Sequence, residues 1–430
     1  MLGAFAQAFR TPDLRNKLLF SLLIMGLFRL GSFIPTPGVS TPNVQQCIAQ
    51  QGQTSLLDLV NMFSGGALLQ LSVFALGIMP YITASIIVQL LRVVIPRFDD
   101  LHKEGQAGQA KLTQYTRYLT IFLGVLQSST IISLAVSNRL FPGCSTPIVP
   151  NNNPMTFGIM VLVMTAGTGV IMWLGELITE RGIGNGMSLL IFTSITATLP
   201  AQLYQVGRGS GWDKVFWIVL LILAITMAVV YIEQAQRRIP VQYAKKMVGR
   251  RLMGGSATYI PLKLNMSGVI PVIFSTSILA IGPMIANFGQ PTDSWVVWIQ
   301  RNFHATSWLY MLINGLLILF FAFFYTSITF NPDEVANNMK RYGGFIPGKR
   351  AGRPTAEYLR FVITRITTAG AIYLVVVALL PSMAMIPLKL ESGQMPFGGT
   401  TLLIVVGVGL QTVKEINSQL QRHHYEGFLQ

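Results

Sequence analysis

The sequence predicts an all-α polytopic membrane protein with ten transmembrane helices. Three observations lead to this fold class: the composition, the number of long apolar segments and the placement of positive charge. Of the 430 residues, 51% are hydrophobic and only 11% are charged, and the mean hydropathy is +0.54. A soluble globular chain carries about 25% charged residues. The chain therefore belongs to the membrane class of proteins.

Ten apolar segments have the length needed to span a bilayer. A helix needs roughly 20 apolar residues to cross about 30 Å of hydrocarbon. Helices are expected because the sequence lacks the alternating ten-residue segments of a membrane barrel. The fifth segment is the weakest, since it starts beside a glycine cluster. The ten segments lie at about 18–34, 71–91, 118–137, 155–175, 187–206, 215–232, 266–286, 307–330, 366–386 and 396–413.

Lys and Arg lie mostly in alternate connecting segments, which would share one side of the membrane. The two longest of these, 233–265 and 331–365, contain seven Lys and Arg each. Positively charged loops stay in the cytoplasm, so these loops and both termini are expected there. Both loops also contain tyrosine, which favours folded docking surfaces for polyanions such as acidic proteins, anionic lipid or RNA. Topogenic charge alone accounts for the composition equally well.

The segment at 56–70 is apolar but too short to cross the membrane alone. It contains Asp58 and the pair Gly65–Gly66. We interpret it as a short re-entrant or half-span helix that is buried in protein.

The ten apolar segments contain no carboxylate, and Arg29 is the only charged residue within them. Arg29 precedes Pro35 by six residues, close enough to the outer boundary for its side chain to reach water. A secondary transporter with inverted repeats is the main alternative, but an ion-coupled transporter normally places a carboxylate at mid-membrane. The sequence therefore disfavours a transporter, and a scaffold with no transport role would leave the 56–70 segment unexplained.

No constellation of residues points to catalysis or to a cofactor. The four histidines lack a metal-ligand spacing such as H-E-x-x-H, and no catalytic triad is recognisable. A run resembling a phosphate-binding loop, Gly343–Lys349, is followed by Arg350 where a magnesium-binding hydroxyl is required. We expect no enzyme activity, no metal and no cofactor.

Eight sequence segments occur in the order found in one protein family. They are FRLGSFIPTPG (28–38), MFSGGAL (62–68), FALGIMPYITASIIVQLL (74–91), MWLGELITERGIGNGMSLLIF (172–192), RRIPVQYAKK (237–246), LKLNMSGVIPVIF (262–274), FFYTSITFNPDEVANNMK (323–340) and FGGTTLLIVVGVGLQTV (397–413). On these segments the chain closely resembles the SecY family, the central subunits of the bacterial Sec protein-conducting channel. One such match could be accidental, but eight in order are specific.

The resemblance implies two pseudo-symmetric five-helix halves around a central pore, residues 1–206 and 207–430. It implies a passive channel in the bacterial inner membrane that passes unfolded secretory polypeptides and releases membrane segments sideways into lipid. The segment at 56–70 matches the family's plug helix, which blocks the resting pore. The matching plug residues are Asp58, Met62, Phe63, Gly65 and Gly66.

The resemblance also implies a constriction ring of aliphatic side chains at mid-membrane. A narrow apolar ring excludes water and ions by dewetting, yet it lets a polypeptide pass without binding it. The ring positions match Ile78, Ile82, Ile191, Ile273 and Ile404.

A lateral gate is implied between spans 2–3 and 7–8. A signal sequence, with about 7–15 apolar residues, would intercalate there and meet lipid. Thr83 and Gln127 match the polar cluster of this gate, and the third member is expected among Ser275–Ser277.

The two basic loops match the sites where the family binds the ribosome and the motor ATPase SecA. Arg250 and Arg251 match a pair that faces ribosomal RNA, and Arg350 matches a loop-tip arginine needed for SecA-driven transport. The small subunits SecE and SecG are further implied partners.

The two cysteines, Cys47 and Cys144, match no family position that we recognise. Both lie in predicted outer loops, where a disulfide between them could form. Its formation depends on their distance in the fold, which the sequence does not give.

Overall fold

The computed structural model describes residues 9, 11–50, 64–137, 140, 144, 146–151, 153–243, 246–248, 251–253, 257–286, 289, 293–303, 307–388 and 399–426. Each of the ten predicted spans corresponds to a helix. These helices are α2 (Pro12–Gly31), α5 (Met79–Val94), α7 (Gln106–Val136), α8 (Pro154–Arg181), α9 (Gly186–Ser210), α10 (Trp212–Gln234), α11 (Ile270–Ala286), α13 (Trp308–Thr329), α15 (Arg353–Leu388) and α16 (Gly399–Glu426). Four shorter helices connect them: α3 (Thr41–Gln50), α6 (Pro96–Lys103), α12 (Ser294–Asn302) and α14 (Pro332–Arg341).

Among the described residues, seven helices are long and apolar enough to cross a membrane. The count is eight if α5 and α6, which meet at a bend of 101°, form one span. Two helices that correspond to predicted spans fall outside this count. α2 contains Asp13, Arg15, Lys17 and Arg29, and α11 is only 17 residues long. The structure is therefore consistent with ten predicted spans, and up to eight of the described helices or bent helix pairs are long and apolar enough to cross a membrane.

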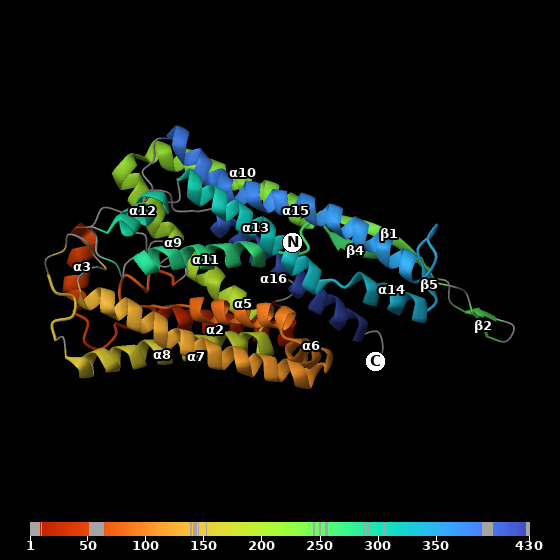
Figure 1. Ribbon diagram of the computed structural model, residues 1–430, viewed down its shortest axis with the longest axis horizontal. Coiled ribbons are helices and arrows are strands. Elements are labelled where there is room, and N and C mark those ends of the chain that lie inside the picture. The colour runs from red at the N-terminus through yellow and green to blue at the C-terminus, as the bar shows by residue number, and fades with distance from the viewer. Residues whose placement is uncertain are drawn as a thin grey trace.

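The helices form two halves with the same internal arrangement. In the first half α2 packs on α8 and α9, α5 on α7, and α7 on α8. In the second half α10 packs on α15 and α16, α11 on α13, and α13 on α15. Figure 1 shows α5, α7 and α8 along one side of the molecule and α10, α13 and α15 along the other. The pseudo-two-fold relation, expected from resemblance, is thus visible in which helices touch.

The second span begins later than its apolar run, so the predicted start at 71 is wrong. Residues 64–78 form turns and one isolated bridge, between Pro35 and Ser72, and the helix begins only at Met79. Leu71 has a φ of 47°, a left-handed conformation that cannot continue an α-helix. Pro80 lies in the first helical turn, where its missing N–H costs nothing.

The predicted short helix at 56–70 is wrong over the part that the structure describes. Residues 64–70 are turns, and Gly65 and Gly66 have φ values of 69° and 87°. These left-handed conformations suit glycine and interrupt a helix. Residues 56–63, which include Asp58, Met62 and Phe63, lie outside the described residues.

The two long basic loops share one β-sheet. Strands β1 (Gln236–Tyr243) and β4 (Ala257–Lys263) form an antiparallel hairpin from the first loop. Strand β5 (Gly344–Phe345) comes from the second loop and pairs with β1, with Gln242 opposite Phe345. Buried side chains of this sheet, including Ile239, pack with α14 and the start of α15 in one apolar cluster. The two loops therefore form one folded unit.

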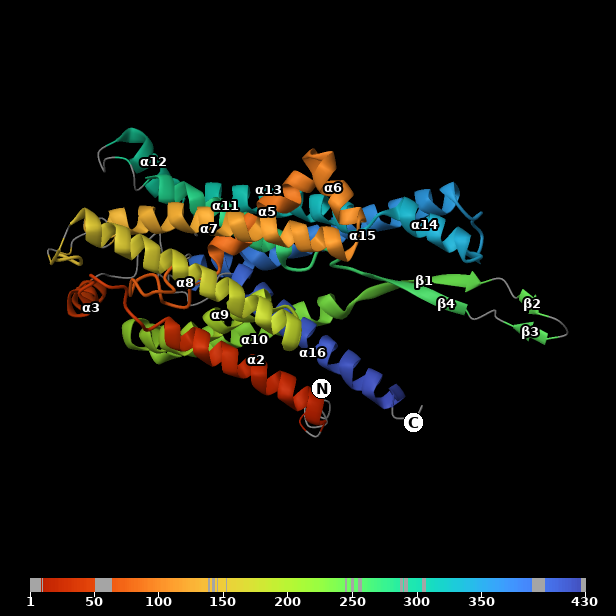
Figure 2. The same ribbon diagram turned by 90° about the horizontal axis from the view of Figure 1, so that it is seen from below.

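This unit lies at one end of the molecule. Figure 2 shows β1 and β4 projecting from the helices, with β2 (Lys246–Val248) and β3 (Arg251–Met253) beyond them. The start of α2 and the end of α16 lie towards the same end, whereas α3 and α12 lie at the opposite one. The first and the last of the long helices thus begin and end, respectively, on the side that carries the basic sheet.

Candidate functional site

The five isoleucines of the predicted ring come together between the two halves. Ile78, Ile82, Ile191 and Ile404 are at most 8% exposed and belong to one buried apolar cluster, against which Ile273 packs. They come from the start of α5, from α9, α11 and α16, and hence from both halves of the chain. Four of the five side chains are therefore almost fully enclosed by protein, and Ile273 is partly buried beside them.

The same cluster contains an aromatic pair from each half. Phe28 of α2 stacks on Phe74, with ring centroids 5.9 Å apart. Phe274 of α11 meets Phe321 of α13 edge to face at 5.4 Å. Such pairs add roughly 0.5–1.5 kcal/mol beyond the burial of their surface. The first pair fixes the turns before α5 against α2, which helps to place Ile78 and Ile82.

The two halves meet where α9 packs on α10 and α16, and also where α5 packs on α11. Thr83 of α5 is half-buried and donates to the carbonyl of Met79 in its own helix at 3.0 Å. Gln127 is half-buried on α7, which packs on α5. Within the described part of the chain, no hydrogen bond joins Thr83 to Gln127. The structure thus places both residues on the helices of the predicted gate without linking them to each other.

Of the three candidates for the third polar gate residue, one forms a bond between helices. The Ser275 hydroxyl is fully buried and donates to the Asn314 side-chain oxygen at 2.6 Å. Thr276 and Ser277 instead donate to carbonyls of their own helix. Ser275 therefore ties α11 to α13 within the second half. Asn314 was overlooked in the sequence analysis, although it is a lone amide in the apolar 307–330 segment.

An ion pair ties α7 to α8 near the end that carries the basic sheet. Arg117 donates to both oxygens of Glu176, at 2.8 and 2.7 Å. Both helices extend beyond the apolar segments that predicted them, and this extension brings Glu176 into α8. A bidentate pair of this kind is strongly directional. It keeps α7 and α8 together as one side of the first half.

A large cavity opens between the halves near the same end. It has a volume of ≈ 1230 Å³ and lies between α5 and α6 on one side and α13, α14 and α15 on the other. Its lining combines apolar side chains such as Val93 and Phe323 with charged ones such as Arg92 and Asp333. The cavity is larger than the roughly 300–1,000 Å³ that is usual for small-molecule pockets.

Arg350 lies at the tip of the turn between β5 and α15. Gly348 and Gly352 on either side have φ values of 80° and 101°. The Thr355 hydroxyl donates to the Arg350 carbonyl at 2.7 Å, while the Arg350 side chain is exposed. The turn therefore fixes the backbone and leaves the guanidinium available to a partner. Arg251 begins β3, and Arg250 lies outside the described residues.

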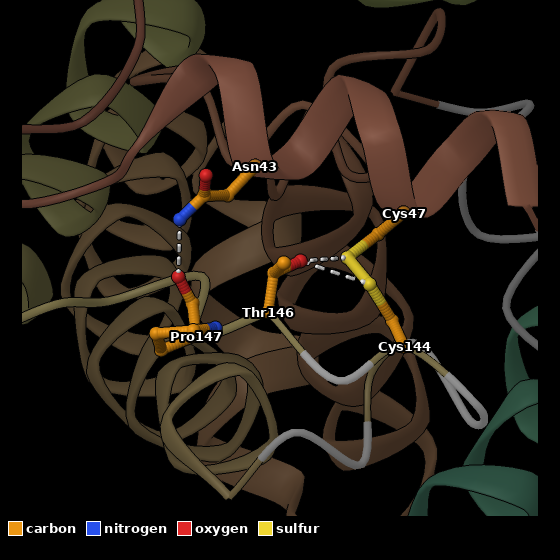
Figure 3. Close-up of a disulfide and its surroundings, with 5 residues drawn as sticks. All are labelled: Asn43, Cys47, Cys144, Thr146 and Pro147. Carbon is orange, nitrogen blue, oxygen red and sulfur yellow. Dashed lines mark hydrogen bonds between the residues drawn. A yellow bond between two sulfur atoms is a disulfide. The ribbon is translucent and has the colours of Figure 1, made fainter.

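A disulfide closes the opposite end of the first half. Cys47 of α3 is bonded to Cys144, with their Cα atoms 5.5 Å apart (Figure 3). The Thr146 hydroxyl donates to the two sulfur atoms at 3.3 and 3.2 Å, and Asn43 donates to the Pro147 carbonyl at 2.8 Å. The sequence does not decide whether the two cysteines are bonded, and the structure shows that they are. The bond fastens α3 to the connection between α7 and α8.

Reduction of this disulfide is expected to lower the thermal stability of the first half. The cysteines are 97 residues apart in the sequence, and opening a loop of this size costs about 2–4 kcal/mol of unfolding free energy. We expect no alkylation of the denatured, unreduced protein, alkylation of two thiols after reduction, and a lower Tm for Cys47→Ser/Cys144→Ser. Two free thiols in protein purified from its native membrane would contradict the prediction.

Comparison with known proteins identifies the family. The SecY family model matches residues 72–413. The chain is 58% identical over 437 residues to "Protein translocase subunit SecY" of Streptomyces coelicolor, with full coverage of both chains. The chain belongs to the SecY family. Its identity to the SecY protein of Mycobacterium tuberculosis is 53% over 443 residues, again with full coverage.

Solved structures of protein-conducting channels share the fold. A structure described as "The structure of a protein conducting channel" matches with a TM-score of 0.64, covering 94% of this chain and 91% of that chain at 18% identity. A Sec61 structure from a canine ribosome–channel complex matches with a TM-score of 0.61 at 16% identity. These matches confirm the predicted fold class, an all-α polytopic membrane protein.

Proposed function

We propose that this chain is the passive pore subunit of a bacterial protein-conducting channel, with no catalytic activity of its own. The observation that carries the proposal is one apolar cluster, built by both halves of the chain, that includes four of the ring isoleucines and against which the fifth, Ile273, packs. An apolar constriction between two halves that touch through few helices can widen for a polypeptide and close again. Family membership favours unfolded secretory polypeptides as the cargo.

The orientation that we propose places both termini and the basic sheet in the cytoplasm. Disulfides persist in oxidising compartments, and the Cys47–Cys144 bond lies at the end with α3, away from the basic sheet. Excess Lys and Arg at the sheet end agrees with the positive-inside rule. Charge and redox chemistry thus support the same orientation independently, with the disulfide on the outer side of the inner membrane.

We propose that the contact between α5 and α11 is the lateral gate. The Arg117–Glu176 pair holds α7 to α8, and the Ser275–Asn314 bond holds α11 to α13. Each side can therefore move as a body while the contact between them opens. We expect a signal sequence to enter through the cavity that α5 and α13 line. Thr83 and Gln127 would then face the entering segment.

We propose that the two long basic loops dock the partners that drive transport. Arg250 and Arg251 are expected to contact ribosomal RNA phosphates, in an interaction that weakens steeply with salt. Arg350 is expected to contact SecA. SecE and SecG are the small subunits expected to brace the two halves. The canine Sec61 structure, whose description names a ribosome complex, supports the ribosome as a partner.

A stalled secretory chain is expected to cross-link to α5 and α11. We would place a photoreactive residue in the signal sequence of a stalled precursor and map the cross-linked peptides by mass spectrometry. Adducts should fall within residues 79–94 and 270–286, and they should disappear when the signal sequence is made polar. A small-molecule transporter, the competing class, would give no precursor adducts at these helices and would move a solute in vesicles instead.

A further inference from the structure

Arg29 contacts the turns that precede α5. It lies two residues before the end of α2, its side chain is half-buried, and its guanidinium sits 4.7 Å from the centre of the Phe33 ring. Its Nη1 donates to the carbonyl oxygen of Gly65. The sequence predicted that this side chain would extend to the outer water. The structure instead directs it to the backbone of another segment.

A guanidinium in an apolar setting needs acceptors for its N–H groups, because an unsatisfied charged donor is costly there. The carbonyl of Gly65 supplies one, and charge-assisted bonds of this kind are about twice as strong as neutral ones. The Phe33 ring supplies a cation–π contact on the guanidinium face. Arg29 thus binds the turn through the backbone carbonyl of Gly65.

Gly65 is held closely between two helices. A Cβ atom at this position would lie 3.1 Å from Nη1 of Arg29 and 3.3 Å from Cα of Ser194. Ser194 lies on α9 next to Ile195 and one turn after Ile191, both of which belong to the central apolar cluster. The turn segment 64–71 is therefore seated against α2 and α9, directly beside the constriction.

We propose that Arg29 is a positioning residue that latches the turn segment 64–71 in this seat. When the segment leaves, the guanidinium loses the Gly65 carbonyl, so the seated state is favoured by that bond. One part of the proposal rests on the proposed function: departure of the segment from its seat favours opening of the channel. A bond to a charged group is worth enough to shift a two-state equilibrium about tenfold or more.

The latch can be tested by the accessibility of a thiol placed in the segment. Ala67 is 1% exposed, so an Ala67→Cys variant carries a thiol that reacts with a membrane-impermeant maleimide only when the segment leaves its seat. Cys47 and Cys144 are bonded to each other and do not react. We would compare labelling rates in full-length protein in vesicles for Ala67→Cys alone and combined with Arg29→Met or Arg29→Lys.

Arg208→Met is the matched control. Arg208 also stacks on an aromatic ring, that of Tyr204 at 4.8 Å, but it lies at the far end of α9. We expect labelling about tenfold faster with Arg29→Met, an intermediate rate with Arg29→Lys, which keeps a donor, and an unchanged rate with Arg208→Met. If Arg29→Met fails to assemble, the labelling rate of Arg29→Lys is compared with that of the parent. A faster rate in Arg29→Lys supports the latch, and an equal rate overturns it.

Equal labelling rates in the parent and the Arg29 variants would overturn the latch. An equal rise with Arg208→Met would also overturn it, because the effect would then be general loosening. Precursor translocation in the same vesicles tests the channel function separately. Normal translocation by the parent together with unchanged labelling would refute the latch alone, whereas loss of translocation by the parent would refute the proposed function.

Discussion

An Ile82→Asn, Ile191→Asn double variant should raise the resting ion conductance about tenfold or more in planar bilayers. Both side chains lie in the buried cluster between the halves, on α5 and α9. An apolar constriction excludes ions because water leaves it, and two amides would give that water hydrogen-bond partners. If each amide lowers the cost of wetting by about 1 kcal/mol, the summed effect exceeds a tenfold change in the open-to-closed ratio.

Two controls separate wetting of the ring from general damage to the fold. Ile82→Leu, Ile191→Leu keeps the volume and the apolar character of the ring, so its conductance should match that of the parent. Ile132→Asn places one amide at a fully buried position in a different apolar cluster, in the first half. It should lower stability without raising conductance. A leak of the same size in Ile132→Asn, or none in the double variant, would contradict the proposed role of the ring.

The helices could be predicted because hydropathy acts locally, along one segment at a time. Each apolar run of about 20 residues became a helix, whatever it packs against. The boundaries were less predictable where a helix continues into water. α15 starts at Arg353, thirteen residues before its apolar run, because its first turns pack on the basic sheet and are not immersed in lipid. Hydropathy has no signal for such an extension.

The sequence contains signals for the later start of α5. Gly77 and Pro80 stand within the apolar run, and both residue types interrupt or begin helices. The predicted start at 71 follows the apolar residues alone and ignores these two signals. The left-handed conformation at Leu71 had no such signal, since it depends on the bridge between Pro35 and Ser72.

The convergence of the ring depends on tertiary structure, and so does the shared sheet. A single isoleucine in a span normally faces lipid or a neighbouring helix, and only the resemblance singled out these five. The pairing of Gln242 with Phe345 joins segments about 100 residues apart, and no local pattern encodes such a register. The Arg29–Gly65 bond is of the same kind, because the turn that presents the carbonyl forms only when α2 and α9 enclose it.

Arg350→Glu should slow SecA-driven translocation at least about tenfold while leaving membrane assembly unchanged. The side chain is exposed at a turn whose backbone is fixed by the Thr355 hydroxyl, so reversing its charge leaves the packed core of the sheet intact. A like-charge contact in a docked complex costs several kcal/mol, which is more than enough for a tenfold effect. Translocation of a purified precursor into vesicles measures it.

Arg353→Glu is the matched control for this prediction. It makes the same charge change three residues away, at the start of α15, where a carboxylate suits the helix N-terminus. It breaks only an exposed pair with Glu357 at 3.3 Å, worth about 0.5 kcal/mol. Translocation should therefore remain near that of the parent. Equal losses in both variants would show that the general charge of the loop matters and the turn tip does not. Normal translocation by Arg350→Glu would remove Arg350 from the docking surface, because no other property of this exposed side chain could compensate for a reversed charge at a contact.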